Sequence, residues 1–177
     1  MAQDTAARLG RLLGIGPIRL FDSAAQLRDH DLLVRAQAAQ RLGAAANAVR
    51  DLAARYRLER IPPATREAPF PPAERMAALR GLEERTQRLQ DIAARVRSAQ
   101  LPAQDLVWER LRTAMVEYEL LLEGDLALLA PCQRCLEAAL ALTLDAADRA
   151  GGLDDLDRTQ SEAERALTAR SALLSAS

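Results

Sequence analysis

Residues 23–60 read SAAQLRDHDLLVRAQAAQRLGAAANAVRDLAARYRLER, and they contain no proline and a single glycine, Gly43. Most of the remaining residues are Ala, Leu, Arg, Gln and Asp, of which all but Asp are strong helix formers. At 1.5 Å of rise per residue, one helix over this stretch would span roughly 55 Å. The sequence therefore predicts a single, unusually long helix that needs other helices beside it.

The second half of this helix carries an apolar seam whose members are spaced alternately by four and three residues. That heptad spacing is typical of a helix packed lengthwise against a partner. We expect the seam to form either the core of a bundle or the interface of an oligomer. Its members are Ala38, Leu42, Ala45, Val49, Leu52 and Tyr56.

A short amphipathic segment precedes the long helix, and it is set apart by a glycine- and proline-containing break. Residues 3–13 place Ala6, Leu9, Leu12 and Leu13 on one side of a helix, and Gly14, Gly16 and Pro17 follow. We therefore divide the chain into residues 1–22 and a helical bundle over residues 23–177. The short helix is expected to cap the bundle or dock on a second subunit, and contact with a membrane surface is the alternative.

Residues 61–72 hold five of the eight prolines and predict a semi-rigid connector between two helices. The long helix must end by Ile61, because Pro62 and Pro63 disfavour helical geometry just before them. Pro72 suits the first turn of the next helix. Phe70 is expected to tuck into the end of the bundle.

Heptad stripes continue along the rest of the chain, and Gly151 and Gly152 mark a stop before the last helix. They predict an all-α, elongated antiparallel helical bundle with coiled-coil-like seams and about five or six helices. The stripes comprise Leu82, Thr86, Leu89, Ala93 and Val96; then Val107, Leu111, Ala114, Tyr118, Leu121 and Leu128, broadened by Met115, Leu122 and Leu129; then Leu136, Ala139, Leu140, Thr143 and Ala147; and finally Leu156, Ala163, Leu167 and Leu174.

Two residues interrupt these stripes in an informative way. Asp125 falls on a seam, where an unpaired carboxylate would cost several kcal/mol, so it should face an Arg of a neighbouring helix or lie at a frayed edge. Residues 128–131 contain no turn-forming residue except Pro131. We therefore expect Pro131 to kink or restart a helix rather than to open a hairpin.

The sharpest local motif is a Cys-x-x-Cys pair, Cys132 and Cys135. A structural zinc site needs four ligands, so this pair could bind metal only if two chains shared the site. A redox role would be helped by a position in the first turn of a helix, but the βαβ context of thioredoxin-like proteins is missing. The favoured interpretation is two small core residues.

No catalytic constellation or cofactor motif emerges. His30 is the only histidine and residue 27 is leucine, so the paired Glu-x-x-His motifs of a di-iron bundle are absent. We accordingly predict no catalytic residue, no cofactor and no enzymatic activity.

Charge patterning points to solvated helices. The formal net charge is −1, and all 24 basic residues are arginine, interleaved with acids. A dedicated nucleic-acid binder would show a dense basic field, so this class is not favoured. No signal-peptide or membrane-spanning pattern occurs, and a cytoplasmic location is expected.

Together these patterns predict a non-enzymatic helical interaction or scaffold protein that self-associates through its long helices as a homo-oligomer. One alternative is a membrane-surface or assembly-forming protein that uses the short N-terminal helix. A weaker alternative is a helical nucleic-acid binder that uses its arginines. The sequence does not identify the partner.

Overall fold

The structure, a computed structural model, describes residues 2–14, 23–63, 65–66, 70–100 and 105–175. Every regular element in these ranges is a helix, which confirms the all-α bundle. The helices are α1 (Ala2–Leu13), α2 (Ala24–Arg60), α3 (Ala73–Ser98), α4 (Asp105–Thr113), α5 (Met115–Ala141), α6 (Leu144–Asp148) and α7 (Asp154–Ser175). The predicted break at Gly16 and Pro17 lies outside the described residues.

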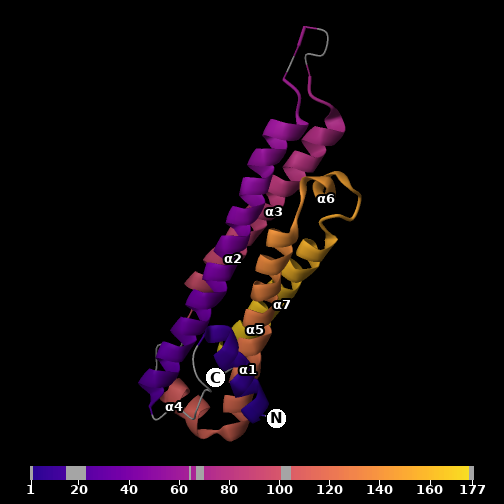
Figure 1. Cartoon of the computed structure of the whole chain (residues 1–177). Coiled ribbons are helices and arrows are strands. Elements are labelled where there is room, and N and C mark those ends of the chain that lie inside the picture. The colour runs from indigo at the N-terminus through magenta and orange to yellow at the C-terminus, as the bar shows by residue number, and fades with distance from the viewer. Residues whose placement is uncertain (1, 15–22, 64, 67–69, 101–104, 176–177) are drawn as a thin grey trace.

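Four long helices, α2, α3, α5 and α7, form the body of an elongated bundle (Figure 1). Helices α2 and α3 run antiparallel to each other, as do α5 and α7, and α2 packs against both α3 and α5. Helix α1 lies against α5, while α4 closes the lower end of the bundle, where both termini are found. The apolar core runs the length of α2.

The long helix begins and ends where its sequence predicts. Ser23 is the N-cap, and its hydroxyl accepts a hydrogen bond of 3.3 Å from the backbone N–H of Gln26. At the other end, Ile61 leaves helical geometry just before the two prolines. Since α2 contacts α3 on one side and α5 on another, its buried face is wider than one heptad seam and also includes Ala39, Ala46 and Ala53.

The second half of the chain contains more helices than expected, so the bundle has seven in its described part rather than five or six. The predicted third seam is divided at Ala114, whose ψ of 100° is not helical, and the Thr113 hydroxyl donates to the Glu109 carbonyl just before this break. Helix α5 then continues through Pro131, in line with the prediction that this proline opens no hairpin. A five-residue helix, α6, follows α5, and its N-cap is Thr143.

Glycines shape the turn that follows α6. Gly151 has a φ of +75°, a left-handed conformation that favours glycine. A Cβ added to Gly152 would lie only 1.9 Å from the Ala146 carbonyl oxygen, so the chain can pass here only without a side chain. The predicted stop at this glycine pair is therefore confirmed, although α5 itself ends earlier.

Three apolar residues predicted to be inward are exposed instead, as is Thr143, which is the N-cap of α6. Phe70 is 84% exposed, so it does not tuck into the end of the bundle. Leu140 is 68% exposed, since it is turned by about 100° from the buried Ala139. Met115 is exposed at the first position of α5, while Leu122 and Leu129 beside it are buried as predicted.

No helix within the described ranges is both long enough and apolar enough to cross a lipid bilayer.

We predict that truncating the seam of α2 strongly destabilises the fold. Leu52 is 6% exposed, so Leu52→Ala should lower the free energy of unfolding by about 2–5 kcal/mol in urea denaturation. Leu58 lies on the same helix but is 84% exposed, and Leu58→Ala should change stability by less than about 0.5 kcal/mol. Equal effects of the two substitutions would contradict the assignment of the buried face.

Candidate functional site

Five polar side chains from three long helices meet inside the bundle, and we call them the buried polar cluster. None is more than 6% exposed. Helix α2 contributes three of them, and α5 and α7 one each, so the cluster joins segments that are far apart in the sequence. The members are His30, Asp31, Arg35, Asp125 and Arg170.

Arg170 is the centre of the cluster, because its guanidinium contacts both carboxylates. Its Nε donates to Asp125 Oδ1 at 2.7 Å, and its Nη2 donates to Asp31 Oδ1 at 2.6 Å. Burial acts to lower the pKa of Arg170, but the charges of Asp125 and Asp31 outweigh burial and raise that pKa. Arg170 is therefore a permanent cation held between two anions.

The remaining members complete the cluster on the α2 side. His30 Nε2 lies 3.0 Å from Asp125 Oδ2, and Arg35 Nε lies 3.0 Å from Asp31 Oδ2. The second contact is an ion pair rather than a well-directed hydrogen bond, because neither atom meets hydrogen-bond geometry. Arg35 also donates from Nη1 to the Ala99 carbonyl at 2.6 Å, which ties the end of α3 to the cluster.

The charges of the cluster balance without a charged histidine. Two aspartates face two arginines, and a neutral imidazole with its proton on Nε2 can donate to Asp125, which as a carboxylate only accepts. Because the members are shielded from solvent, the arrangement is suited to holding α2, α5 and α7 together. It offers no surface on which a substrate could bind.

The sequence prediction for Asp125 is confirmed, since it does face an arginine of a neighbouring helix. The sequence patterns do not identify the other four members as site residues. Arg170 carried a usable signal, because it lies three residues after Leu167 and four before Leu174, both of which were predicted to face inward. An arginine at such a position is the natural partner for an aspartate on a facing seam.

Both cysteines lie in the core, with no exposed surface. Because α5 runs continuously through Pro131, they sit in the interior of the helix and not in a first turn, so the dipole argument for a reactive thiol does not apply. Burial raises the pKa of Cys132 to about 12, and it also raises the pKa of Cys135. Thiols placed in this way are not presented to a second chain.

Within the described residues, no three His, Cys, Asp or Glu side chains are grouped so as to hold a metal ion.

The residues of the predicted interaction seam are buried inside the bundle of a single chain. None of its five members is more than 6% exposed, and they pack in the core formed by α2 with α3 and α5. Tyr56 also donates a hydrogen bond to Asp148 of α6, and this bond helps to lower the pKa of the Asp148 carboxyl. The members are Leu42, Ala45, Val49, Leu52 and Tyr56.

The apolar side of helix α1 is also buried within the same chain. Ala6, Leu9 and Leu13 are buried where α1 packs against α5, and Leu9 has no exposed surface. Arg41 of α2 donates to the Leu12 carbonyl and so fixes the end of α1. The side of α1 that faces solvent carries Arg8 and Arg11.

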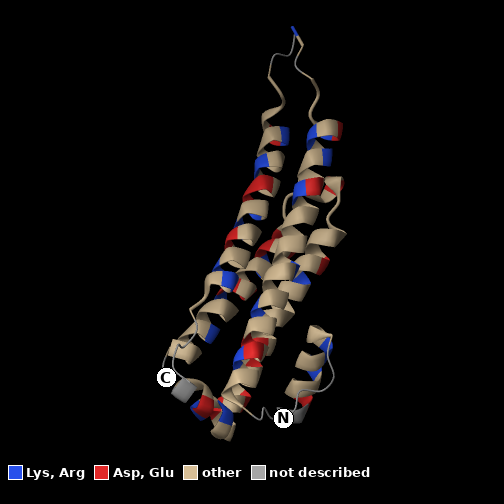
Figure 2. Ribbon diagram, turned by 90° about the vertical axis from the view of Figure 1, so that its left-hand side faces the viewer, with Lys and Arg blue, Asp and Glu red and all other residues tan. Residues whose placement is uncertain are grey.

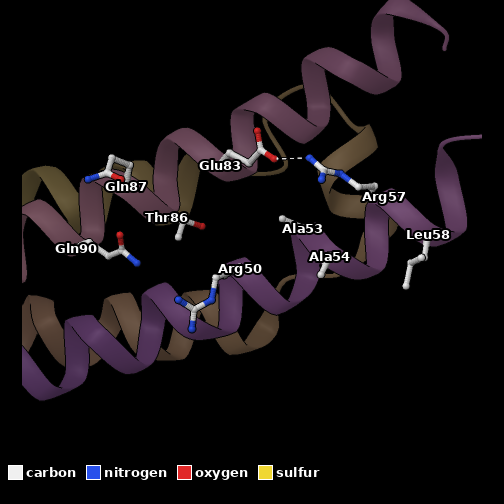
Figure 3. A pocket seen from close by; sticks show the side chains of 9 residues that line it. All are labelled: Arg50, Ala53, Ala54, Arg57, Leu58, Glu83, Thr86, Gln87 and Gln90. Atoms are coloured by element: carbon white, nitrogen blue, oxygen red, sulfur yellow. Dashed lines mark hydrogen bonds and ion pairs between the residues drawn. The ribbon is translucent and has the colours of Figure 1, made fainter. Parts of the chain in front are cut away.

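The outer surface has a groove between α2 and α3, with a volume of about 560 Å³ (Figure 3). Ala53 of α2 and Thr86 of α3 lie between the two helices, Ala54 lines the α2 side, and Leu58 is exposed at one end. Arg57 and Glu83 form an ion pair of 3.0 Å across the groove. The other lining residues are Arg50, Gln87 and Gln90. A groove lined by alanines, a leucine and longer polar side chains is suited to an amphipathic segment.

We predict that removing the central cation is strongly destabilising. Arg170→Ala leaves Asp31 and Asp125 buried without their shared partner, which should lower the free energy of unfolding by about 3–5 kcal/mol. The control is Arg165→Ala on the same helix, because Arg165 is exposed and should contribute less than about 0.5 kcal/mol. An Arg170→Ala protein as stable as the control would show that the cluster is open to water.

The Cys132 thiol should be slow to react and should make stability depend on pH in the alkaline range. Its folded-state pKa of about 12 lies above the ordinary value of 9.0, so the folded chain keeps a proton that the unfolded chain loses. The stability from this group is full below pH 9 and is lost as the pH rises towards 12. Cys132→Ala should flatten that decline in urea titrations.

Thiol labelling at neutral pH provides the second measurement on the cysteines. Both should label only as fast as the chain unfolds, because a shielded and protonated thiol is a poor nucleophile. Rapid labelling of the folded protein would mean that the cysteines are accessible.

Comparisons with models of protein families, with curated proteins and with solved structures found no match to this chain. The side-chain arrangement is therefore the basis for a proposal of function. Of the features above, the buried polar cluster, the thiols and the α2 seam are enclosed by the bundle. The outer faces of the long helices are where a ligand or partner could make contact.

Proposed function

We propose that this chain is a non-enzymatic helical interaction or scaffold protein that self-associates through the outer faces of its long helices. The observation that carries the proposal is the exposure of large apolar side chains along those faces. Leu58 on α2 is 84% exposed, and Val116 and Leu120 on α5 are 73% and 45% exposed. Val116 and Leu120 lie one turn apart on α5, and adjoining apolar groups on an outer helix face are typical of a contact with another protein.

The proposal places self-association on surfaces other than the predicted seam. The seam residues of α2 are already covered by α3 and α5 in one chain. A second copy could reach them only if the bundle opened, which would expose most of its core. The outer faces need no such rearrangement.

A non-enzymatic role is supported by where the reactive groups lie. His30, Asp31 and Asp125 are buried in charge-balanced contacts, and both thiols are shielded. A general acid or base must come within hydrogen-bond distance of a substrate. These side chains serve packing and pairing instead.

The two alternative functions have less support. The apolar side of α1 is buried against α5, so binding to a membrane through that side would first require α1 to detach. Acidic and basic residues are interleaved along the helices (Figure 2), and many arginines form ion pairs between helices, as Arg88 does with Glu164 at 2.6 Å. An interleaved surface of this kind lacks the basic field that attracts nucleic acid.

The mass of the protein in solution tests the proposal. We expect light scattering coupled to gel filtration to give a multiple of the 19.3 kDa chain mass, with the fraction of assembled protein rising with concentration. Association through apolar contacts should persist at high salt, because the Debye length falls to about 3 Å at 1 M salt and only charge–charge attraction is screened. A mass of one chain at every concentration would refute self-association.

A further inference from the structure

Helix α5 carries a second heptad stripe, on the side opposite its buried seam. We call it the outer stripe of α5. Its members follow spacings of four and three residues over the whole length of the helix, as the members of a packed seam do. They are Val116, Leu120, Glu123, Ala127, Ala130, Arg134, Glu137 and Ala141.

The outer stripe is open to solvent in one chain. All its members are exposed except Ala130, which is half-buried beside α1. Large apolar side chains lie at its first two positions, and alanines lie at its middle, where two helices could approach closely. A heptad stripe of this kind on an outer face is equipped to receive another helix.

The order of charges along the stripe identifies the second helix. In an antiparallel pair of α5 helices, each step forward on one chain matches an equal step back on the other. We place the two-fold axis between Ala127 and Ala130. Ala127 of each copy then faces Ala130 of the other copy. Glu123 then faces Arg134, Val116 faces Ala141, and Leu120 lies opposite Glu137. The small and oppositely charged positions of the stripe are therefore complementary to themselves, as a two-fold interface requires, and the Leu120 position pairs an apolar side chain with the stem of an exposed glutamate.

A parallel pair would have the opposite electrostatics. It would place Glu123 against Glu123 and Arg134 against Arg134, and like charges at an interface are unfavourable. Arg134 already donates to Glu162 at 2.6 Å, but its side chain is 50% exposed and a guanidinium has five N–H donors. It can therefore contact a second carboxylate without losing the first.

Helix α1 adds charge complementarity at the edge of the stripe. Arg8 and Arg11 line a recess of about 380 Å³ beside Ala130, and neither has an ion-pair partner within the described residues. In the antiparallel pair, the acidic half of the second copy's α5, which carries Glu119 and Glu123, approaches this side. Arg8 and Arg11, without an ion-pair partner in the part of the chain that the structure describes, thus line a recess with Arg134 and Glu137 on the side that these carboxylates approach.

We propose that the outer stripe of α5 is the interface of a homodimer in which two α5 helices pack antiparallel about a two-fold axis. The occupant of the stripe is a second copy of this chain. The inference deepens the proposed function and rests on it, because it names the surface and the register of self-association. The groove between α2 and α3 is the competing surface.

Two matched substitutions distinguish these surfaces. Ala127→Arg places an arginine near the axis, close to Arg134 of the second copy, and should weaken the dimer by about a hundredfold. Ala54→Arg makes the same change at an exposed alanine of α2 in the competing groove and should leave the mass unchanged. Thermal unfolding followed by circular dichroism should show that both variants fold.

The outcomes separate the inference from the proposed function. Loss of the dimer in Ala127→Arg alone supports the α5 interface. Loss of the dimer in Ala54→Arg alone overturns the α5 interface but still supports self-association. A wild-type protein that is monomeric at every concentration overturns both.

Crosslinking tests the antiparallel register. Val116→Cys and Ala141→Cys should each remain uncrosslinked by a short bis-maleimide, while an equal mixture, unfolded and refolded together, should give crosslinked dimers. Cys132 and Cys135 are buried and should not react. Crosslinking of Val116→Cys with itself would show a parallel pair and overturn the register.

Discussion

The pairing of Arg170 with Asp31 and Asp125 is the constraint on which the arrangement of the three helices depends. Each of these side chains is almost completely buried, and a buried charge without a partner is strongly destabilising. A shift of α7 by one turn, about 5.4 Å, would separate the guanidinium from both carboxylates. The three helices can therefore pack in only one register without leaving a buried charge unpaired.

The need for such a constraint follows from the composition of the core. Alanines such as Ala38, Ala39, Ala45 and Ala46 fill much of the buried face of α2, and small side chains provide few distinct knobs and holes. Replacing a buried ion pair with apolar residues is often neutral or stabilising, so net stability is a weak reason for the cluster. We infer that its main contribution is to fix the register of interfaces that alanine leaves poorly specified.

The parts of the fold that could be predicted from the sequence are those where periodicity is strong. The long helix, its cap at Ser23, the connector after Arg60 and the inward face of α7 all follow from spacing and local breaker residues. The break at Ala114 and the separation of α6 from α5 could not be found in this way, since no glycine or proline marks either position. Of the buried polar cluster, only Asp125 could be identified from the sequence. Heptad patterns are recognised by their apolar residues, so a polar residue that faces inward does not contribute to the pattern.

The two stripes of α5 show why spacing alone does not identify an interface. Both have heptad spacing, but the inner one carries leucines and cysteines and buries far more apolar surface, so folding selects it for the core. The outer stripe has only two large apolar members, and the area they can bury is small beside that of an obligate dimer. Its charges then determine orientation more than strength, because exposed ion pairs contribute little energy but oppose a parallel pairing. Such an interface would form and dissociate as the concentration of the protein changes, without any opening of the bundle that carries it.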